Sequence, residues 1–108
     1  MYLPASFTSF QKKFSDVYSH YEALTKACRV HGPLDRKQQD MIKLGIAIGQ
    51  QSKGAVMSQT RKALSSGATA EEIEHALLLS LTTVGFQAMI AAMGWVNEVI
   101  EKFTPGEK

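Results

Sequence analysis

The sequence lacks several features that would point to particular classes of protein. Its one cysteine, Cys28, excludes an intrachain disulfide and favours a reducing, cytoplasmic setting. The net charge of +2 gives no electrostatic reason to expect a nucleic acid or an anionic membrane as partner. No apolar run approaches the roughly 18 residues needed to cross a bilayer. Residues 1–6 also lack the basic and apolar stretches of a signal peptide. We therefore expect a cytoplasmic protein with neither membrane nor nucleic-acid partner.

Histidine is also sparse, and its pattern does not indicate a metal site. His20, His31 and His75 are the three histidines. No two of them lie three or four positions apart, and no group of acidic residues joins them. The sequence therefore predicts neither a metal nor another cofactor.

What the sequence does contain is helical periodicity. Hydrophobic residues make up 44% of the 108 residues and charged residues 20%, which is typical of a single globular domain. In the first expected helix, apolar residues recur three and four positions apart over about six turns. They are Phe7, Phe10, Phe14, Val17, Tyr21, Leu24 and Cys28. No segment alternates with period two. The sequence thus predicts an all-α fold, a single-domain bundle of about five to six helices over residues 1–108.

The boundaries of the first two helices can be predicted from local residues. Gly32 and Pro33 stop the first helix. Asp35 is the expected N-cap of the second helix, and Gln38 completes a pair of the capping-box kind. Cys28 lies on the apolar face of the first helix, so we expect its thiol to be buried.

Three further helices follow. The third is expected over about residues 53–65 and closes at Gly67. Thr69, followed three residues later by a glutamate, is a capping box that begins the fourth. Gly85 separates the fourth helix from a fifth, which a Pro-Gly pair at residues 105–106 ends.

Three segments stand out between residues 34 and 90. They are LDRKQQDMI at residues 34–42, TRKALSSGATAEEI at residues 60–73 and VGFQA at residues 84–88. Together, and without a gap, they resemble the alkylhydroperoxidase D-like / carboxymuconolactone decarboxylase family. Of these, the run containing Gly-Ala-Thr is the most specific. The resemblance implies a family-like core over about residues 34–103. It also implies subunits that associate through their helices into homo-trimers or homo-hexamers.

The resemblance further implies where a reactive centre would lie. Active members of the family use a glutamate, a Cys-x-x-Cys pair and a histidine for thiol chemistry with proton relay. This sequence has Asp40, Ser52, Ala55 and Gln59 at the matching positions. Alanine cannot resolve a disulfide, and an amide cannot carry a proton near neutral pH. We therefore expect no dithiol peroxidase activity. The decarboxylase branch of the family is similar in having a histidine at the position of Gln59. The glutamine found here therefore argues against lactone decarboxylation as well.

Two interpretations of these changes remain open. In the first, the chain is a non-redox, homo-oligomeric protein that binds a small molecule or a partner through a neutral polar set. That set is Gln50, Gln51, Ser52 and Gln59. In the second, the chain is an enzyme of altered, decarboxylase- or hydrolase-like chemistry that uses Asp40 with Ser52 or His75. The polar set is equally compatible with an inert remnant, and Ser52 with a helix N-cap.

Trp95 is the residue most indicative of a contact between subunits. It is offset from the main apolar stripe of the fifth helix and has Gly94 beside it. An aromatic side chain in that position is typical of a helix–helix interface. The second expected helix is apolar on more than one side, which independently favours a partner surface.

Overall fold

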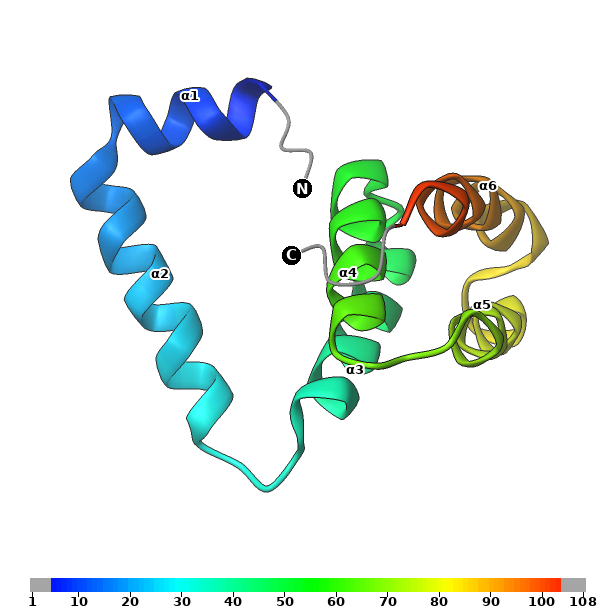
Figure 1. Cartoon of the computed structure of the whole chain (residues 1–108). Helices are drawn as coiled ribbons and strands as arrows, with labels where there is room; N and C mark the ends of the chain where they lie inside the picture. Colours follow the sequence, from blue (N-terminus) through cyan, green and yellow to red (C-terminus); the bar gives the residue numbers. More distant parts are fainter. Residues whose placement is uncertain (1–4, 104–108) are drawn as a thin grey trace. The chain divides into compact units, whose positions relative to one another are not determined.

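The computed structural model describes residues 5–103, which form six α-helices and no strand (Figure 1). This confirms the predicted all-α class and number of helices. The helices are α1 (Ala5–Lys13), α2 (Ser15–Val30), α3 (Arg36–Gln50), α4 (Lys53–Ser65), α5 (Ala70–Val84) and α6 (Phe86–Lys102). Their contacts divide the chain into two compact units, Met1–Pro33 and Leu34–Lys108. The Pro-Gly pair at residues 105–106 lies outside the described residues.

None of the helices over residues 5–103 is both long enough and apolar enough to cross a lipid bilayer.

The first unit contains two helices where the sequence predicted one, so that prediction was wrong. At the break, Phe14 leaves the helical conformation, with φ −126° and ψ 53°. The ring centroids of Phe7 and Tyr18 consequently lie 5.8 Å apart. A straight helix would separate these residues by about 16 Å along its axis. The ring of Phe10 lies 5.7 Å from Phe14 and 6.5 Å from Tyr18. Apolar periodicity cannot reveal such a break, because the same stripe continues on both sides of it.

The two helices of the first unit keep their side chains at least partly exposed. Neither α1 nor α2 contains a buried residue. Cys28 is exposed, so the prediction of a buried thiol was wrong.

The second unit begins its helices where the sequence predicted. Asp35 accepts a hydrogen bond from the backbone amide of Gln38 at 2.8 Å, and the Gln38 side chain accepts one from the amide of Asp35 at 3.0 Å. Thr69 and Glu72 make the same reciprocal pair at the start of α5, at 3.0 and 2.8 Å. Both predicted capping boxes are confirmed. They satisfy backbone donors that the first turn of a helix leaves without partners.

The end of α4 is also determined locally. Gly67 takes a φ of 102°, which a residue without a Cβ adopts at little cost. The amide of Ala68 then reaches the carbonyl of Ala63 at 2.9 Å, and the amide of Gly67 reaches that of Leu64 at 3.2 Å. These two hydrogen bonds form a Schellman motif. The turn directs Ala68 into the core, where it is 5% exposed.

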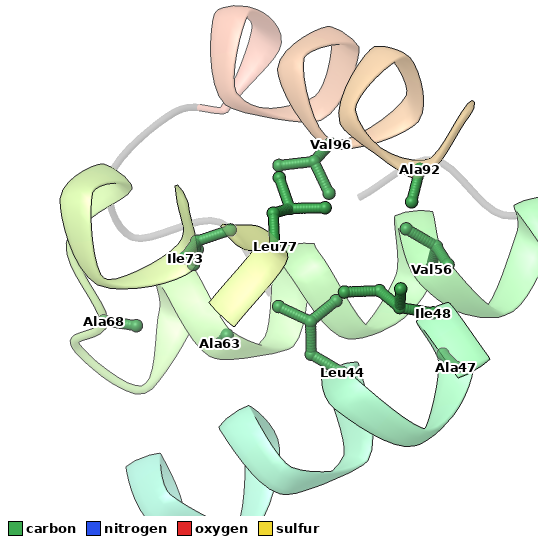
Figure 2. Packing of buried hydrophobic residues seen from close by; sticks show 10 residues of the cluster. All are labelled: Leu44, Ala47, Ile48, Val56, Ala63, Ala68, Ile73, Leu77, Ala92 and Val96. Atoms are coloured by element: carbon green, nitrogen blue, oxygen red, sulfur yellow. The ribbon is translucent and has the colours of Figure 1, made fainter. Parts of the chain in front are cut away.

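The core of the second unit lies where α3, α4, α5 and α6 meet (Figure 2). Figure 2 shows Leu77 of α5 against Val96 of α6, and Leu44 and Ile48 of α3 on the opposite side. The buried cluster consists of Leu44, Ala47, Ile48, Val56, Ala63, Ala68, Ile73, Leu77, Ala92 and Val96. Several alanines in this set let the helices approach closely.

An ion pair joins α3 to α5 at the edge of this core. The Nζ atom of Lys37 lies 2.7 Å from Oε2 of Glu72. The hydrogen bond from Lys37, followed by that from the backbone of Thr69, lowers the pKa of Glu72 below its ordinary 4.5. A carboxyl group whose pKa is lowered by folding contributes stability above its unfolded-state pKa. That contribution is lost as the pH falls through the folded-state pKa.

We therefore expect Glu72→Gln to lower the free energy of unfolding near neutral pH. The difference between the variant and the parent is expected to shrink progressively below pH 4.5. Glutamine keeps the capping-box hydrogen bond to Thr69 but loses the charge that Lys37 stabilises. Urea unfolding at a series of pH values measures the effect. Glu74→Gln, at an exposed position of the same helix, is the matched control. The same pH dependence in both variants would contradict the role given to the Lys37 pair.

Candidate functional site

Asp40, at the position matching the family glutamate, is fully buried one turn into α3. Its Oδ2 atom lies 3.3 Å from Nε of Arg36, one helical turn earlier. The Arg36 side chain remains 61% exposed, so the pair extends from the interior to the surface. A buried carboxylate needs a cation or hydrogen-bond donors to offset its lost hydration. Arg36 supplies such a donor, and its spacing of four residues makes the contact possible within one helix.

Ser52, at the first family cysteine position, is the N-cap of α4, as predicted. Its Oγ atom accepts a hydrogen bond from the amide of Ala55 at 3.4 Å, and the residue is exposed. The preceding residue, Gln51, has the left-handed conformation, with φ 55° and ψ 35°. This conformation ends α3 and turns the chain into α4. Ser52 therefore has a structural role in starting α4, and Ala55 presents only a methyl group.

Gln59, at the family histidine position, is half-buried on the stripe of α4 that also carries Ser52 and Ala55. Its Oε1 atom is buried and accepts no hydrogen bond. An amide oxygen in the interior without a donor is unfavourable, because it has lost water and gained nothing in return. Of the four family positions, this one shows an unmet need for a hydrogen-bond donor.

The other candidate residues lie on the surface. Gln50 and Gln51 are exposed with Ser52 at the turn between α3 and α4. The structure thus brings these three together, and it places the Gln59 oxygen inside the helical packing. His75 is exposed on α5. Trp95 is half-buried and packs against the core cluster from α6.

Two polar side chains near these positions, Arg36 and Arg61, were not predicted from the sequence. Arg36 could have been found from its spacing to Asp40. Arg61 could not, because its distinguishing property is tertiary. Its Nε atom is buried without an acceptor, although the side chain is not completely enclosed. Thr60, which precedes Arg61 in the chain, is fully buried and donates a 2.7 Å hydrogen bond from its hydroxyl to the carbonyl of Val56.

The chemistry available at the family positions is that of hydrogen bonding and charge. None of the four residues offers a thiol, and the amide of Gln59 does not titrate. Within residues 5–103, no three histidine, cysteine, aspartate or glutamate residues are grouped so that they could hold a metal ion. An acidic group, a hydroxyl and an amide acceptor remain. Such groups recognise polar small molecules more readily than they transfer electrons.

Comparison with known proteins shows what this chain is similar to. The sequence model of the carboxymuconolactone decarboxylase family matches residues 15–98, from the start of α2 almost to the end of α6. The match therefore begins before the core that the resemblance alone implied.

Two individual proteins are similar to this chain. One is a nitrosuccinic acid decarboxylase of Metarhizium robertsii, 34% identical over 73 residues. That alignment covers 64% of this chain and 51% of the fungal enzyme, so the chain spans about half the length of this relative. The other is a carboxymuconolactone decarboxylase family protein from Legionella pneumophila, whose crystal structure is of the apo form. It superposes with a TM-score of 0.77 over 89% of this chain and 86% of that one, at 21% identity, which establishes similarity of fold.

Proposed function

Because the chain belongs to the carboxymuconolactone decarboxylase family, we propose that it is a homo-oligomeric member that binds a small polar molecule without dithiol redox chemistry. The observation that carries this proposal is the buried Oε1 atom of Gln59, which has no hydrogen-bond donor. A ligand with an N–H or O–H group would satisfy it. The absence of thiols at Ser52 and Ala55 supports the second part of the proposal.

The site of binding is proposed to extend from Gln59 to the polar turn between α3 and α4. Gln50, Gln51 and Ser52 offer donors and acceptors there without charge. Neutral groups of this kind select a ligand by the arrangement of its hydrogen bonds. Asp40, paired with Arg36 at 3.3 Å, lies near the start of α3, ten residues before Gln50.

A second candidate function is decarboxylation of a small acid, favoured by the 34% identity to a nitrosuccinic acid decarboxylase. A carboxylate on a carbon that also bears a nitro group can lose CO2 without a thiol. The carbon–carbon bond breaks, its electron pair delocalises into the nitro group, and the carbon then takes a proton. In this scheme Asp40 would act as the acid or base, with Ser52 or His75 contributing a hydrogen bond.

The two candidates can be separated on the full chain with nitrosuccinate as a decarboxylation substrate, and with malate and succinate as binding probes that differ by one hydroxyl donor. We expect saturable binding of malate by calorimetry, tighter than that of succinate and weakened about tenfold in Gln59→Leu, which corresponds to the loss of one hydrogen bond of ~1.4 kcal/mol. Gln87→Leu, at an exposed position on α6 outside the proposed site, is the control and is expected to leave the affinity unchanged. We also expect no reduction of hydroperoxides with a dithiol donor and no consumption of muconolactone.

Three other results would contradict the ligand-binding proposal in part. Release of CO2 from nitrosuccinate above a heat-denatured control, abolished in Asp40→Asn, would favour the decarboxylase. Hydroperoxide reduction that depends on the dithiol would overturn the non-redox proposal. Failure of Gln59→Leu to change binding would remove Gln59 from the site.

A further inference from the structure

Arg61 of α4 holds a hydrogen-bond donor inside the second unit without an acceptor. Its Nε atom is buried and donates no hydrogen bond. The side chain as a whole is half-buried, so part of it still reaches the surface. A guanidinium group stays charged at every physiological pH and carries five N–H donors. Because a charge withdrawn from water needs an opposite charge or acceptors nearby, this arginine requires an anion.

The sequence around Arg61 supplies no such anion. Residues 41–70 contain four basic residues and no aspartate or glutamate. Met57 and Leu64, one turn before and one turn after Arg61 on α4, are half-buried and apolar. Apolar neighbours of this kind can cover the aliphatic part of an arginine, but they offer its Nε–H group no acceptor.

The acidic residues of the helices packed against α4 have other partners or lie on the surface. Helix α4 packs mainly on α3 and α6. The acidic residue of α3, Asp40, pairs with Arg36 at 3.3 Å. On α6, Glu98 lies 3.6 Å from Nζ of Lys102, and the other glutamate of that helix is exposed. None of these carboxylates accepts a hydrogen bond from the buried Nε atom.

We propose that Arg61 is the anchor of an anion-binding site on α4, at which an oxyanion of a small ligand accepts hydrogen bonds from the guanidinium group. A planar guanidinium matches a carboxylate, sulfate or phosphate through parallel N–H···O bonds. The positive charge of residues 41–70 favours the approach of an anion. Residues two positions apart on a helix do not face each other, so this site is separate from the oxygen of Gln59. The inference therefore goes beyond the function proposed above.

The Nε–H signals of the arginines in a nitrogen-15-labelled protein test this site directly. The chain contains Arg29, Arg36 and Arg61, and Arg61→Lys assigns the third signal by removing it. We expect acetate and sulfate to shift the Arg61 signal saturably at constant ionic strength, with chloride as the reference anion. Neither probe carries an N–H or O–H donor at neutral pH, so neither can satisfy Gln59. The Arg36 signal is the internal control and is expected to move little, because its Nε atom already contacts Asp40.

Two variants separate the guanidinium group from the general charge of the helix. Arg61→Lys keeps the charge but loses the planar arrangement of donors. We expect it to bind acetate and sulfate about tenfold more weakly, as the loss of one hydrogen bond to a charged group implies. Lys53→Gln removes a charge at an exposed position of the same helix and is the matched control. Its affinity is expected to stay close to that of the parent. The rise in thermal unfolding temperature relative to chloride measures binding in both variants.

The outcomes distinguish the ligand class and leave the Gln59 proposal independent. Saturation by either probe supports the site, and tighter binding of acetate or of sulfate identifies a carboxylic acid or a sulfate- or phosphate-like group as the source. Equal shifts with chloride, equal shifts of the Arg36 and Arg61 signals, or an equal loss in Lys53→Gln and Arg61→Lys would overturn it. Gln59→Leu is expected to leave these titrations unchanged, so either site can fail without the other.

Discussion

Leu44→Ala is expected to lower the free energy of unfolding by about 3–5 kcal/mol, the largest effect predicted for this chain. Leu44 is 0% exposed and belongs to the buried cluster that joins α3 to α4, α5 and α6 (Figure 2). Truncation removes apolar contacts and leaves a cavity that surrounding helices can only partly fill. Since small domains are stable by roughly 5–15 kcal/mol, the variant would lose a large share of its stability. Urea unfolding followed by circular dichroism measures the change.

Ile46→Ala is the matched control for this experiment. Ile46 lies on the same helix, two residues further on, but is 57% exposed. Its truncation removes a side chain of the same volume class without opening the core, so we expect a loss below about 1 kcal/mol. Equal losses in the two variants would contradict the assignment of Leu44 to the core and Ile46 to the surface.

Gly85→Ala is expected to destabilise the fold by about 1–3 kcal/mol, the second largest effect. Gly85 joins α5 to α6 with φ 96° and ψ 165°, a conformation that residues with a Cβ rarely adopt. A Cβ added there would meet no atom within 4 Å. The expected cost is therefore backbone strain, not a steric clash. Thermal unfolding of the variant and of the parent measures it.

Gly45→Ala provides a control of opposite sign. Gly45 lies in the interior of α3, and a Cβ there also meets no atom within 4 Å. Because alanine favours the helix over glycine, we expect this variant to be more stable by up to about 1 kcal/mol. If both glycine substitutions had the same sign, the special conformation at Gly85 would not be the cause of its effect.

The best sequence predictions concerned structure decided by neighbouring residues. The capping boxes at Asp35 and Thr69, the Ser52 cap and the Gly67 turn involve partners within a few positions. Such hydrogen bonds form the same way whatever packs around them. The failures at Phe14 and Cys28 have the complementary cause. The apolar periodicity continues unchanged through the bend at Phe14, and the exposure of Cys28 depends on what surrounds its helix.

The candidate site divides in the same way. Its residue types, and therefore the loss of thiols at Ser52 and Ala55, could be read from the sequence. The spacing of Arg36 and Asp40 allowed an ion pair, but only the packed helices show that the aspartate is fully buried while the arginine reaches solvent. Nor could the sequence show that the Gln59 oxygen lacks a donor, because that requires knowing every atom around it.

The sequence by itself therefore determined the helices, most of their ends and the chemical groups at the family positions, since these follow from residue identity and contacts between close neighbours. The tertiary structure alone decided which of those groups are buried and which of them have hydrogen-bond partners. The reason is physical. Burial and hydrogen-bond satisfaction are properties of packing between distant segments, and one helix face looks the same in the sequence whether its own chain or another molecule covers it.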